Sequence, residues 1–203
     1  MVSSTAPRGG RRPGATSTRE AILAAARAAF FERSYAGATI RGIAAAAAVD
    51  PALVLHYFGN KRGLFAAAMD LPFDPGDVVA AALAAPARER GIALARAALS
   101  AWEAPGSGEV LIGLMRSAVS DEASAARLRE FLTEAVLAPI AAALEGPNAM
   151  LAASLAMSHL MGVLFARHIA RVGPLADAPL AGLIPLLGAG LQQYFDAAPE
   201  APA

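Results

Sequence analysis

The side chains best suited to binding a polyanion lie between residues 39 and 61, in the stretch TIRGIAAAAAVDPALVLHYFGNK. Seven of them are candidates for contact with double-stranded DNA: Thr39, Arg41, Ala52, Leu53, His56, Tyr57 and Lys61. The hydroxyls of Thr39 and Tyr57 and the ammonium of Lys61 can donate to phosphate oxygens, which gives affinity without reading sequence. These three side chains are the expected phosphate contacts.

The other four candidates would face the bases, and they offer little hydrogen bonding. Arg41 can donate to a phosphate or to a base edge, and His56 offers one polar contact to a purine or a phosphate. Ala52 and Leu53 offer only apolar contact, for which a thymine methyl group is the natural partner. Base selection is therefore expected to lean on DNA shape and on the arginines within residues 8–12.

Short helices separated by a tight turn must position these side chains. Thr39 is a helix N-cap residue type, and apolar residues follow it at helical spacing. Asp50 and Pro51 form a second start signal, because aspartate accepts from orphan amides and proline at the first helical position loses no hydrogen bond. The second helix is expected over residues 51–58, and Asn60 can cap a further helix. This order predicts a DNA-binding helix-turn-helix.

The second of these helices resembles the recognition helix of the tetracycline-repressor (TetR) family of bacterial transcription regulators. The family string V-S-x-G-T-L-Y-x-Y-F-x-S-K stands here as VDPALVLHYFGNK, residues 49–61. The match is specific at Val49, Tyr57, Phe58 and Lys61. The resemblance in the DNA-binding part covers about residues 18–66.

The sequence departs from the family string at three positions. Leu53 replaces a small hydroxyl residue, Leu55 replaces a tyrosine, and Ala48 occupies the usual turn glycine. Because Leu53 and Leu55 lie on the recognition helix, these changes bear on the DNA sequence that is read more than on the fold.

Composition rich in alanine, leucine and proline predicts an all-α chain, and with the resemblance it predicts three parts. Residues 1–16 form a disordered basic arm, residues 17–66 a three-helix helix-turn-helix DNA-binding domain, and residues 67–203 a helical ligand-binding and dimerisation domain. Proline and glycine punctuation predicts the helices of the last part over residues 76–86, 88–104, 108–118, 121–145, 148–172 and 179–196. The order Met-Asp-Leu-Pro-Phe-Asp-Pro after residue 68 is similar to a C-terminal domain type of actinobacterial members.

The implied function is that of a homodimeric repressor in the cytoplasm. A dimer presents two recognition helices to half-sites one helical turn apart, so the operator should be pseudo-palindromic. The resemblance implies that a small molecule binds the C-terminal domain and releases the protein from DNA. Physically, such a ligand acts only by binding one conformation better than another.

The charge distribution places a polyanion partner at the N-terminal end. The chain has no net charge, but residues 1–62 hold nine basic and three acidic residues, a net charge of +6. The remaining residues hold eight basic and fourteen acidic residues. Binding to DNA should therefore weaken strongly as salt is added. The arginines of residues 1–16 could reach a minor groove or could simply keep the chain soluble.

An effector cavity would be lined by methionine and aromatic residues of the second domain. The candidates are Phe65, Met69, Trp102, Met115, Phe131, Met157, His159, Met161 and Phe165. Such a stripe is also typical of an ordinary core, and His159 can equally be a core or interface histidine. Because few ionisable groups could face this cavity, it should favour an apolar compound with few charges.

Two segments of 18 uncharged residues, 149–166 and 178–195, reach the lower limit for a membrane span. They contain serine, histidine, proline and glutamine and are rich in alanine, so no membrane insertion is expected. A helix that is apolar nearly all round can instead lie between a domain core and a second subunit. The resemblance implies a homodimer that forms through helices 148–172 and 179–196.

Catalysis is not expected, and neither a cofactor nor a metal is called for. The chain has no cysteine and shows no phosphate-binding glycine loop, nucleophile elbow or His-Glu-x-x-His motif. Glu130 and Glu134 share a helix face, and Arg127 precedes Glu130 by three residues, so these side chains are expected to be a solvated, ion-paired face.

Three hypotheses remain open from the sequence. The first is a ligand-responsive dimeric repressor, and the second is a regulator that answers to a protein partner or to none. The third is a small-molecule-binding helical protein with weak or non-specific DNA binding. The basic N-terminal end and Lys61 favour the first two.

Overall fold

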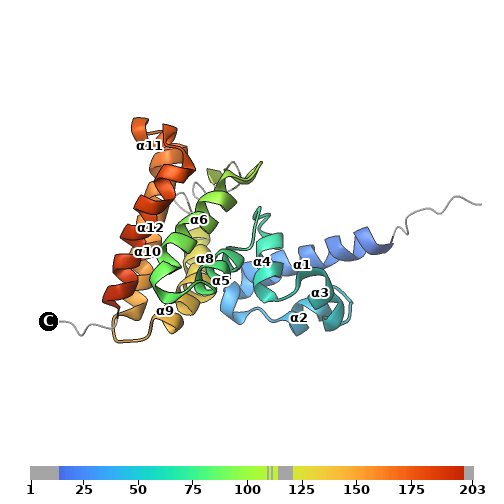
Figure 1. Ribbon diagram of the computed structural model, residues 1–203. Helices are drawn as coiled ribbons and strands as arrows, with labels where there is room; N and C mark the ends of the chain where they lie inside the picture. The colour runs from blue at the N-terminus through green and yellow to red at the C-terminus, as the bar shows by residue number, and fades with distance from the viewer. Residues whose placement is uncertain (1–13, 109, 111, 114–120, 199–203) are drawn as a thin grey trace, which may run out of the picture.

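The computed structural model of the chain describes residues 14–108, 110, 112–113 and 121–198, with side chains from residue 17 onward. All regular structure in these residues is helical, which confirms the predicted all-α class (Figure 1). The α-helices are α1 (Gly14–Gly37), α2 (Ile40–Ala46), α3 (Pro51–Phe58), α4 (Lys61–Ala68), α5 (Pro75–Leu83), α6 (Arg90–Glu103), α8 (Glu122–Leu132), α9 (Ala138–Leu144), α10 (Ala149–Leu164), α11 (Gly173–Asp177) and α12 (Leu180–Ala197). The structure also contains a 3-10 turn, η1 (Ala87–Glu89), and two π-helical segments, η2 (Thr133–Leu137) and η3 (Phe165–Ile169).

Helices α1 to α4 form an N-terminal unit, here called the head, and the three predicted helix starts are all confirmed in it. The Thr39 side chain accepts from the Gly42 amide at 3.0 Å, and Asp50 accepts from the Ala52 amide at 2.7 Å. Asn60 accepts from the Gly63 amide at 2.9 Å. Each cap satisfies an amide that the first helical turn leaves without a partner.

The core of the head is built on one stripe of α1. Ile22, Ala26 and Phe30 are completely buried and recur at helical spacing. They meet Ile43 of α2 and Leu64 of α4, which are also completely buried. Burial of this apolar stripe is the main force that holds the helix-turn-helix on α1.

The remaining helices form a bundle in which α6 packs against α5 and α12, and α10 packs against α9 and α12. Gly91 of α6 and Gly188 of α12 permit this close crossing. A β-carbon on Gly188 would lie 2.6 Å from the Cα of Ile92, and one on Gly91 would meet the carbonyl of Gly188. Only glycine fits both positions, because either contact is shorter than carbon and oxygen atoms tolerate.

The predicted helix over residues 121–145 is present with an internal π-helical segment. α8, η2 and α9 run on from one another without a break between residues 122 and 144. The long helix expected over residues 148–172 likewise ends in η3. The predicted helix over 108–118 and the arginines of residues 8–12 lie largely or wholly outside the described residues.

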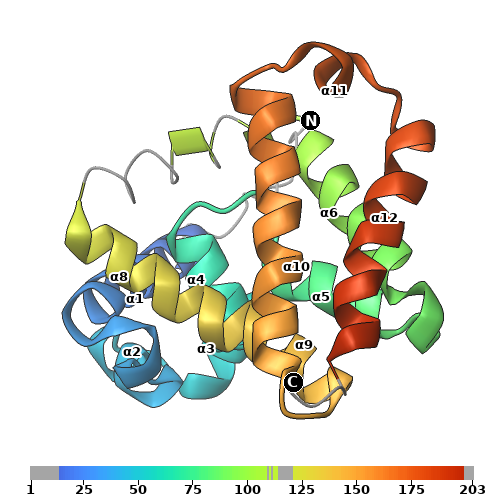
Figure 2. The ribbon, with the colours of Figure 1, turned by 90° about the vertical axis from the view of Figure 1, so that its left-hand side faces the viewer.

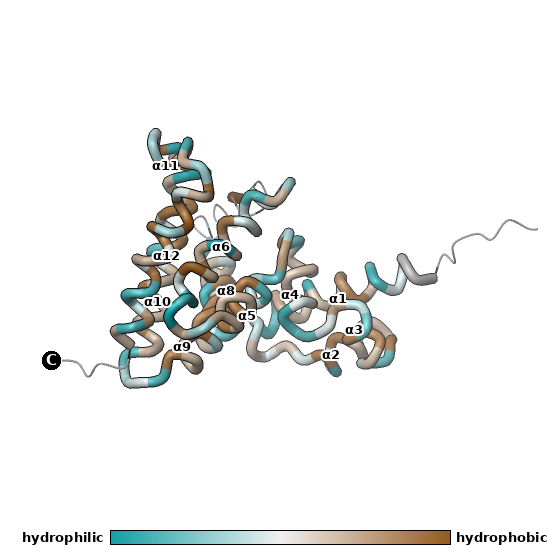
Figure 3. The backbone as a smooth tube through the Cα atoms, viewed as in Figure 1, coloured by the Kyte–Doolittle hydropathy of each residue, from teal (hydrophilic) through white to brown (hydrophobic). Residues whose placement is uncertain are grey.

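α8 connects the head to the bundle. It packs against α1, and Figure 2 shows it crossing the α1 and α4 side of the molecule beside α10. Hydrophobic residues occur in both units (Figure 3), so each has apolar side chains to bury. Ala149–Ile169 is long and apolar enough to cross a membrane by length and composition alone, and a third of its most apolar window is buried within the protein.

Candidate nucleic-acid interface and effector cavity

The sequence-predicted DNA contacts lie on three helices: Thr39 and Arg41 at the start of α2, Ala52, Leu53, His56 and Tyr57 along α3, and Lys61 at the start of α4. Figure 1 shows α2 and α3 on the side of the head remote from the bundle. Those with exposed side chains are Thr39, Arg41, Ala52 and His56, and those partly exposed are Leu53, Tyr57 and Lys61. The Thr39 hydroxyl accepts the capping hydrogen bond, and its own proton can still be donated to an acceptor. The head therefore presents donors and an apolar recognition-helix start on one accessible surface.

Lys61 also has contacts within the protein. Its Nζ donates to the carbonyl of Ala36 at 3.1 Å and lies 4.7 Å from the centre of the Tyr35 ring. An ammonium group has three donors, so a phosphate could still be bound by those not directed at Ala36. Lys61 thus links the start of α4 to the end of α1.

Glu130 of α8 binds that same end of α1, which the sequence did not reveal. Its carboxylate accepts from Ser34 Oγ at 2.8 Å, from the Tyr35 amide at 3.2 Å and from the Ala36 amide at 2.7 Å. The expected solvated, ion-paired face is therefore wrong for Glu130. Its partners lie more than 90 residues away in sequence, so no local pattern could have identified them.

The backbone of residues 34–36, at the end of α1, is strained, and the charged Glu130 carboxylate holds it in place. Ser34 has φ 62° and ψ −179°, a conformation that is costly for a residue with a β-carbon. Burial by itself would raise the pKa of Glu130, but hydrogen bonds from Ala36, Ser34 and Tyr35 and the charge of Lys61 together lower the pKa. Glu130 is therefore held as a carboxylate against residues 34–36, here called the α1 corner.

A second polar link joins α4 to α5. Arg62 Nε lies 2.8 Å from Asp74 Oδ1 and 2.9 Å from Asp74 Oδ2, and Arg62 Nη2 lies 3.4 Å from Asp77 Oδ1. Asp74 also caps α5 by accepting from the Gly76 amide at 2.9 Å. These contacts tie the start of α4 to the start of α5 across the short linker between the head and the bundle.

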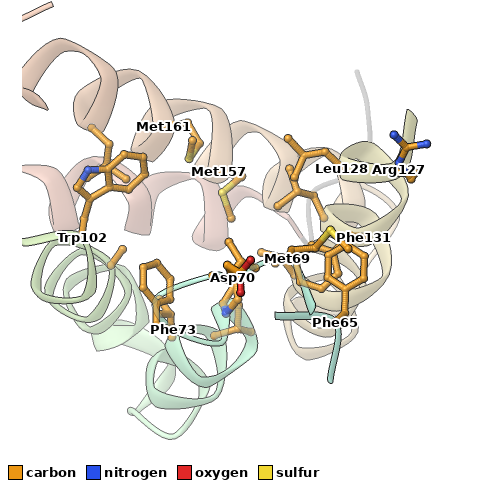
Figure 4. A pocket seen from close by; sticks show the side chains of 18 of the residues that line it. Phe65, Met69, Asp70, Phe73, Trp102, Arg127, Leu128, Phe131, Met157 and Met161 are labelled. Carbon is orange, nitrogen blue, oxygen red and sulfur yellow. The ribbon is translucent and has the colours of Figure 1, made fainter. Parts of the chain in front are cut away.

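A cavity of about 530 Å³ lies where the head meets the bundle. Its walls come from α1, α4, α5, α6, α8 and α10, together with the linker after α4. Figure 4 shows Phe65, Phe131 and Arg127 towards one end and Trp102 at the other, with Met157 and Met161 between them. The volume lies in the range of sites for drug-sized molecules.

Most of the sequence-predicted lining residues are brought together in this cavity: Phe65, Met69, Trp102, Phe131, Met157 and Met161. Sequence reasoning missed much of the rest, including Phe31, Phe73, Leu94, Leu128 and Leu160. Leucine and valine at helical spacing are the commonest core residues, and their pattern does not distinguish a cavity wall from filled core.

Two predicted lining residues lie elsewhere. The His159 ring packs on α12, 5.9 Å from the Tyr194 ring and close to Gly190, and it is absent from the cavity wall. Phe165 is 48% exposed and also outside the cavity. His159 is two residues from both Met157 and Met161 and so lies on another face of α10. Phe165 follows the end of α10, as the first residue of the π-helical segment η3. Met115 is outside the described residues.

The cavity is apolar apart from a few polar side chains. The charged ones are Arg27, Asp70 and Arg127, and Arg27 is paired with Asp70 at 3.2 Å. Arg127 lies over the Phe31 ring at 4.7 Å. The Trp102 Nε1 atom is buried and has no hydrogen-bond partner among the described residues.

At the Trp102 end of the cavity, the ring of His168 packs against the tryptophan ring. Trp102 and His168 are stacked with ring centres 5.9 Å apart and planes 18° apart. Burial lowers the pKa of His168, and the charge of Arg167 lowers it further against the opposing effect of Glu103. The imidazole is therefore favoured in its neutral form, which suits this apolar end.

An aromatic cluster joins the cavity to the α1 corner. The Phe131 ring is stacked on Phe65 at 4.2 Å and meets the Tyr35 ring edge-on at 5.3 Å. Tyr35 in turn meets Phe65 at 5.2 Å. Since Phe65 and Phe131 line the cavity and Tyr35 is in the corner, a molecule in the cavity would touch side chains that pack directly on the corner.

Groups of three or more potential metal ligands are absent from the part of the chain that the structure describes.

Two family models match the chain. "Bacterial regulatory proteins, tetR family" matches residues 22–68, and "Tetracyclin repressor-like, C-terminal domain" matches residues 89–195. None of the curated proteins matches it.

Solved structures resemble the chain over most of its length. A TetR-family regulator from Streptomyces coelicolor is 35% identical, with 93% of this chain and 99% of that chain covered and a TM-score of 0.47. A TetR-family transcriptional regulator from Mesorhizobium loti is 18% identical, with coverage of 93% and 98% and a TM-score of 0.50. The multidrug binding protein EbrR, solved with proflavin, is 22% identical, with coverage of 87% and 99% and a TM-score of 0.47.

Proposed function

Because this chain belongs to the TetR family of transcriptional regulators, we propose that it is a homodimeric repressor whose operator binding is released by a small apolar effector. The family match covers more than half of the chain. The protein is thus a DNA-binding transcription factor and not an enzyme. The single observation that best supports effector control is that the cavity is walled by α1 and α4 of the DNA-binding head as well as by the bundle.

DNA binding is assigned to residues 17–66 and effector binding to the cavity of the 67–203 domain, to whose wall α1 and α4 also contribute. Thr39, Tyr57 and Lys61 donate to phosphates, and Arg41 binds a phosphate or a base edge. Thr39 and Arg41 at the start of α2 and Lys61 at the start of α4 are accessible, which supports these roles because helix N-termini favour negative charge. Tyr57 is partly exposed in the last turn of α3.

Base reading is assigned to the first two turns of α3. Ala52, Leu53 and His56 are all accessible on this helix, and the Asp50 cap fixes its start. The apolar pair meets thymine methyl groups, and His56 makes the polar contact. This small number of donors leaves a large share of specificity to DNA shape.

The effector is expected to be drug-sized, apolar and of low charge. Aliphatic, methionine and aromatic side chains dominate the cavity, and Arg27 is already paired with Asp70. A strongly charged molecule would lose its hydration there without a matching partner. Phe65, Met69, Trp102, Phe131, Met157 and Met161 are the proposed contacts.

Dimerisation is assigned to α10 and α12, the helices that correspond to predicted segments 148–172 and 179–196. α10 exposes Leu151 (60%) and Leu155 (43%), and α12 exposes Leu186 (77%). Large apolar side chains left exposed on neighbouring helices are costly in water and favour association. A second copy on this face would cover them and set the spacing of the two recognition helices. The dimer is proposed to act in the cytoplasm.

An effector screen tests this function with the single tryptophan of the chain as reporter. Trp102 lines the cavity, so a compound that enters should change its fluorescence. We expect such compounds to weaken binding to an operator selected by the protein from random duplexes. Compounds that change Trp102 fluorescence and leave operator affinity unaltered would contradict effector control.

A further inference from the structure

We propose that Glu130 is the positioning residue that transmits occupancy of the cavity to the helix-turn-helix, by holding the α1 corner from α8. This inference rests on the proposed function, because it names the contact through which effector control of DNA binding would operate. The residues concerned are Glu130 itself, the corner at 34–36, Lys61 and the cavity residue Phe131.

The first step is that the corner is held by one side chain of the bundle. The Glu130 carboxylate accepts from two consecutive backbone amides, Tyr35 and Ala36, and from the Ser34 hydroxyl, all within 3.2 Å. Charge-assisted hydrogen bonds of this kind are stronger than neutral ones. A shift of α8 must therefore move the corner with it or break all three contacts.

The second step is that the corner sets where α2 begins. Ala36 is three residues from the Thr39 cap, and α2 starts at Ile40. Ser34 holds a positive φ that few residues adopt, so the chain direction at this point depends on tertiary contacts. Releasing Glu130 would let the backbone relax and change how α2 and α3 are presented.

The third step is that Ala36 is held from both sides. Its amide donates to Glu130, and its carbonyl accepts from Lys61 Nζ at 3.1 Å. Lys61 is also a proposed phosphate contact, so the same ammonium group faces the corner and the DNA side. A change at Glu130 would therefore alter the position of a DNA-binding charge.

The fourth step is that the cavity acts on the same turn of α8. Arg127, Leu128 and Phe131 line the cavity, and Glu130 lies among them on the helix. The π-helical segment η2 follows directly, and such segments mark places where helix register can change. A ligand that displaces Phe131 from its stack on Phe65 would move the Glu130 backbone by the same rotation or shift of α8.

Amide hydrogen exchange tests the contact itself. Glu130→Ala should speed exchange of the Tyr35 and Ala36 amides by about ten-fold or more, since both lose their acceptor. Glu130→Asp keeps the charge but shortens the side chain, and it should speed exchange similarly. Glu134→Ala, on the exposed next turn, is the matched control and should leave both amides unchanged. Equal protection in the Glu130 and Glu134 variants would overturn the proposal.

A double-mutant cycle tests transmission without knowing the effector. Ala98→Phe places a large ring in the cavity from α6, remote from Glu130, and serves as a built-in occupant. Its effect on affinity for the selected operator is measured in the natural chain and in the Glu130→Ala and Glu134→Ala backgrounds. We expect a loss of at least about five-fold in the natural and Glu134→Ala chains and less than about two-fold in Glu130→Ala.

The outcomes separate the two proposals. The same loss in all three backgrounds would show that the signal bypasses Glu130 and would overturn this inference while leaving effector control intact. No loss in any background, repeated with Met161→Trp as a second cavity-filling variant, would contradict effector control itself, and this inference would fall with it. Circular dichroism on each variant identifies any that fail to fold. If Ala98→Phe fails to fold, Met161→Trp replaces it in the double-mutant cycle.

Discussion

Glu130 on α8 and Ala36 at the end of α1 are joined by a hydrogen bond of 2.7 Å from the Ala36 amide to the Glu130 carboxylate, across 94 residues of sequence. The contact ties the wall of an apolar cavity to the start of a helix-turn-helix.

The stability of the protein should depend on pH through Glu130. Its pKa is lowered from 4.5 in the folded state, since the hydrogen bonds at the corner and the Lys61 charge outweigh burial. A carboxylate whose folded pKa is lowered stabilises the protein above its ordinary pKa, and this contribution is lost as the pH falls through the folded pKa. Glu130→Gln should therefore be less stable than the natural chain at pH 7.

Urea unfolding at several pH values checks this difference. The difference in free energy of unfolding between the natural chain and Glu130→Gln should narrow from pH 5 downward, because a protonated carboxyl group resembles the amide. A gap that stays constant to pH 3 would show that Glu130 stabilises the fold by packing alone.

Replacing Ala48 with glycine should stabilise the head. Ala48 occupies the turn between α2 and α3 with φ 55°, a left-handed conformation that is costly for a residue with a β-carbon. Ala48→Gly removes this cost, and we expect a gain of about 1 kcal/mol. Thermal unfolding measures it, with Ala45→Gly inside α2 as the control, which should lose about 1 kcal/mol. A loss from Ala48→Gly would contradict the assigned turn conformation.

The two kinds of DNA contact should respond differently to mutation. Lys61→Ala should weaken binding to all duplexes about equally and reduce the salt dependence by about one ion, because it removes a phosphate contact. His56→Ala should change preference at one base position by about 1–3 kcal/mol. Binding to a panel of single-base operator variants distinguishes the two. A uniform loss for His56→Ala would remove this residue from base reading.

Charge on the outer face of α10 and α12 should prevent dimerisation. Leu151→Arg and Leu186→Arg each place a cation among exposed apolar side chains, and we expect monomers at micromolar concentration and weaker operator binding. Sedimentation equilibrium measures the mass. Leu55→Arg is the control, since Leu55 is 44% exposed on α3 in the head and should leave the mass unchanged. Dimers in all three variants would place the interface elsewhere.

The local parts of the fold could be predicted from sequence, and the long-range parts could not. Caps at Thr39, Asp50 and Asn60 bind amides two or three residues away, so residue type and spacing are sufficient to find them. Glu130 has partners far away in sequence, and its neighbours on α8 suggested a solvated face instead.

The lining of the cavity could be predicted only in part. Phe65 and Trp102 were suggested by residue type and lie on its wall, whereas His159 and Phe165 had equally suitable types and lie outside it. Which face of a nearly uniformly apolar helix points inward depends on its packing partners, here α12 for His159. Sequence periodicity does not contain that information.

The most direct test of the function is selection of bound duplexes from a random pool at near-physiological salt, followed by affinity for the winner against scrambled DNA. The proposed dimeric regulator predicts a two-fold symmetric winner, with half-sites about 34–36 Å apart. It should be bound at least about a thousand-fold more tightly than scrambled DNA. No enriched sequence, or equal affinity for the winner and scrambled DNA, would contradict a site-specific regulator and leave the basic end of the chain as a non-specific DNA contact.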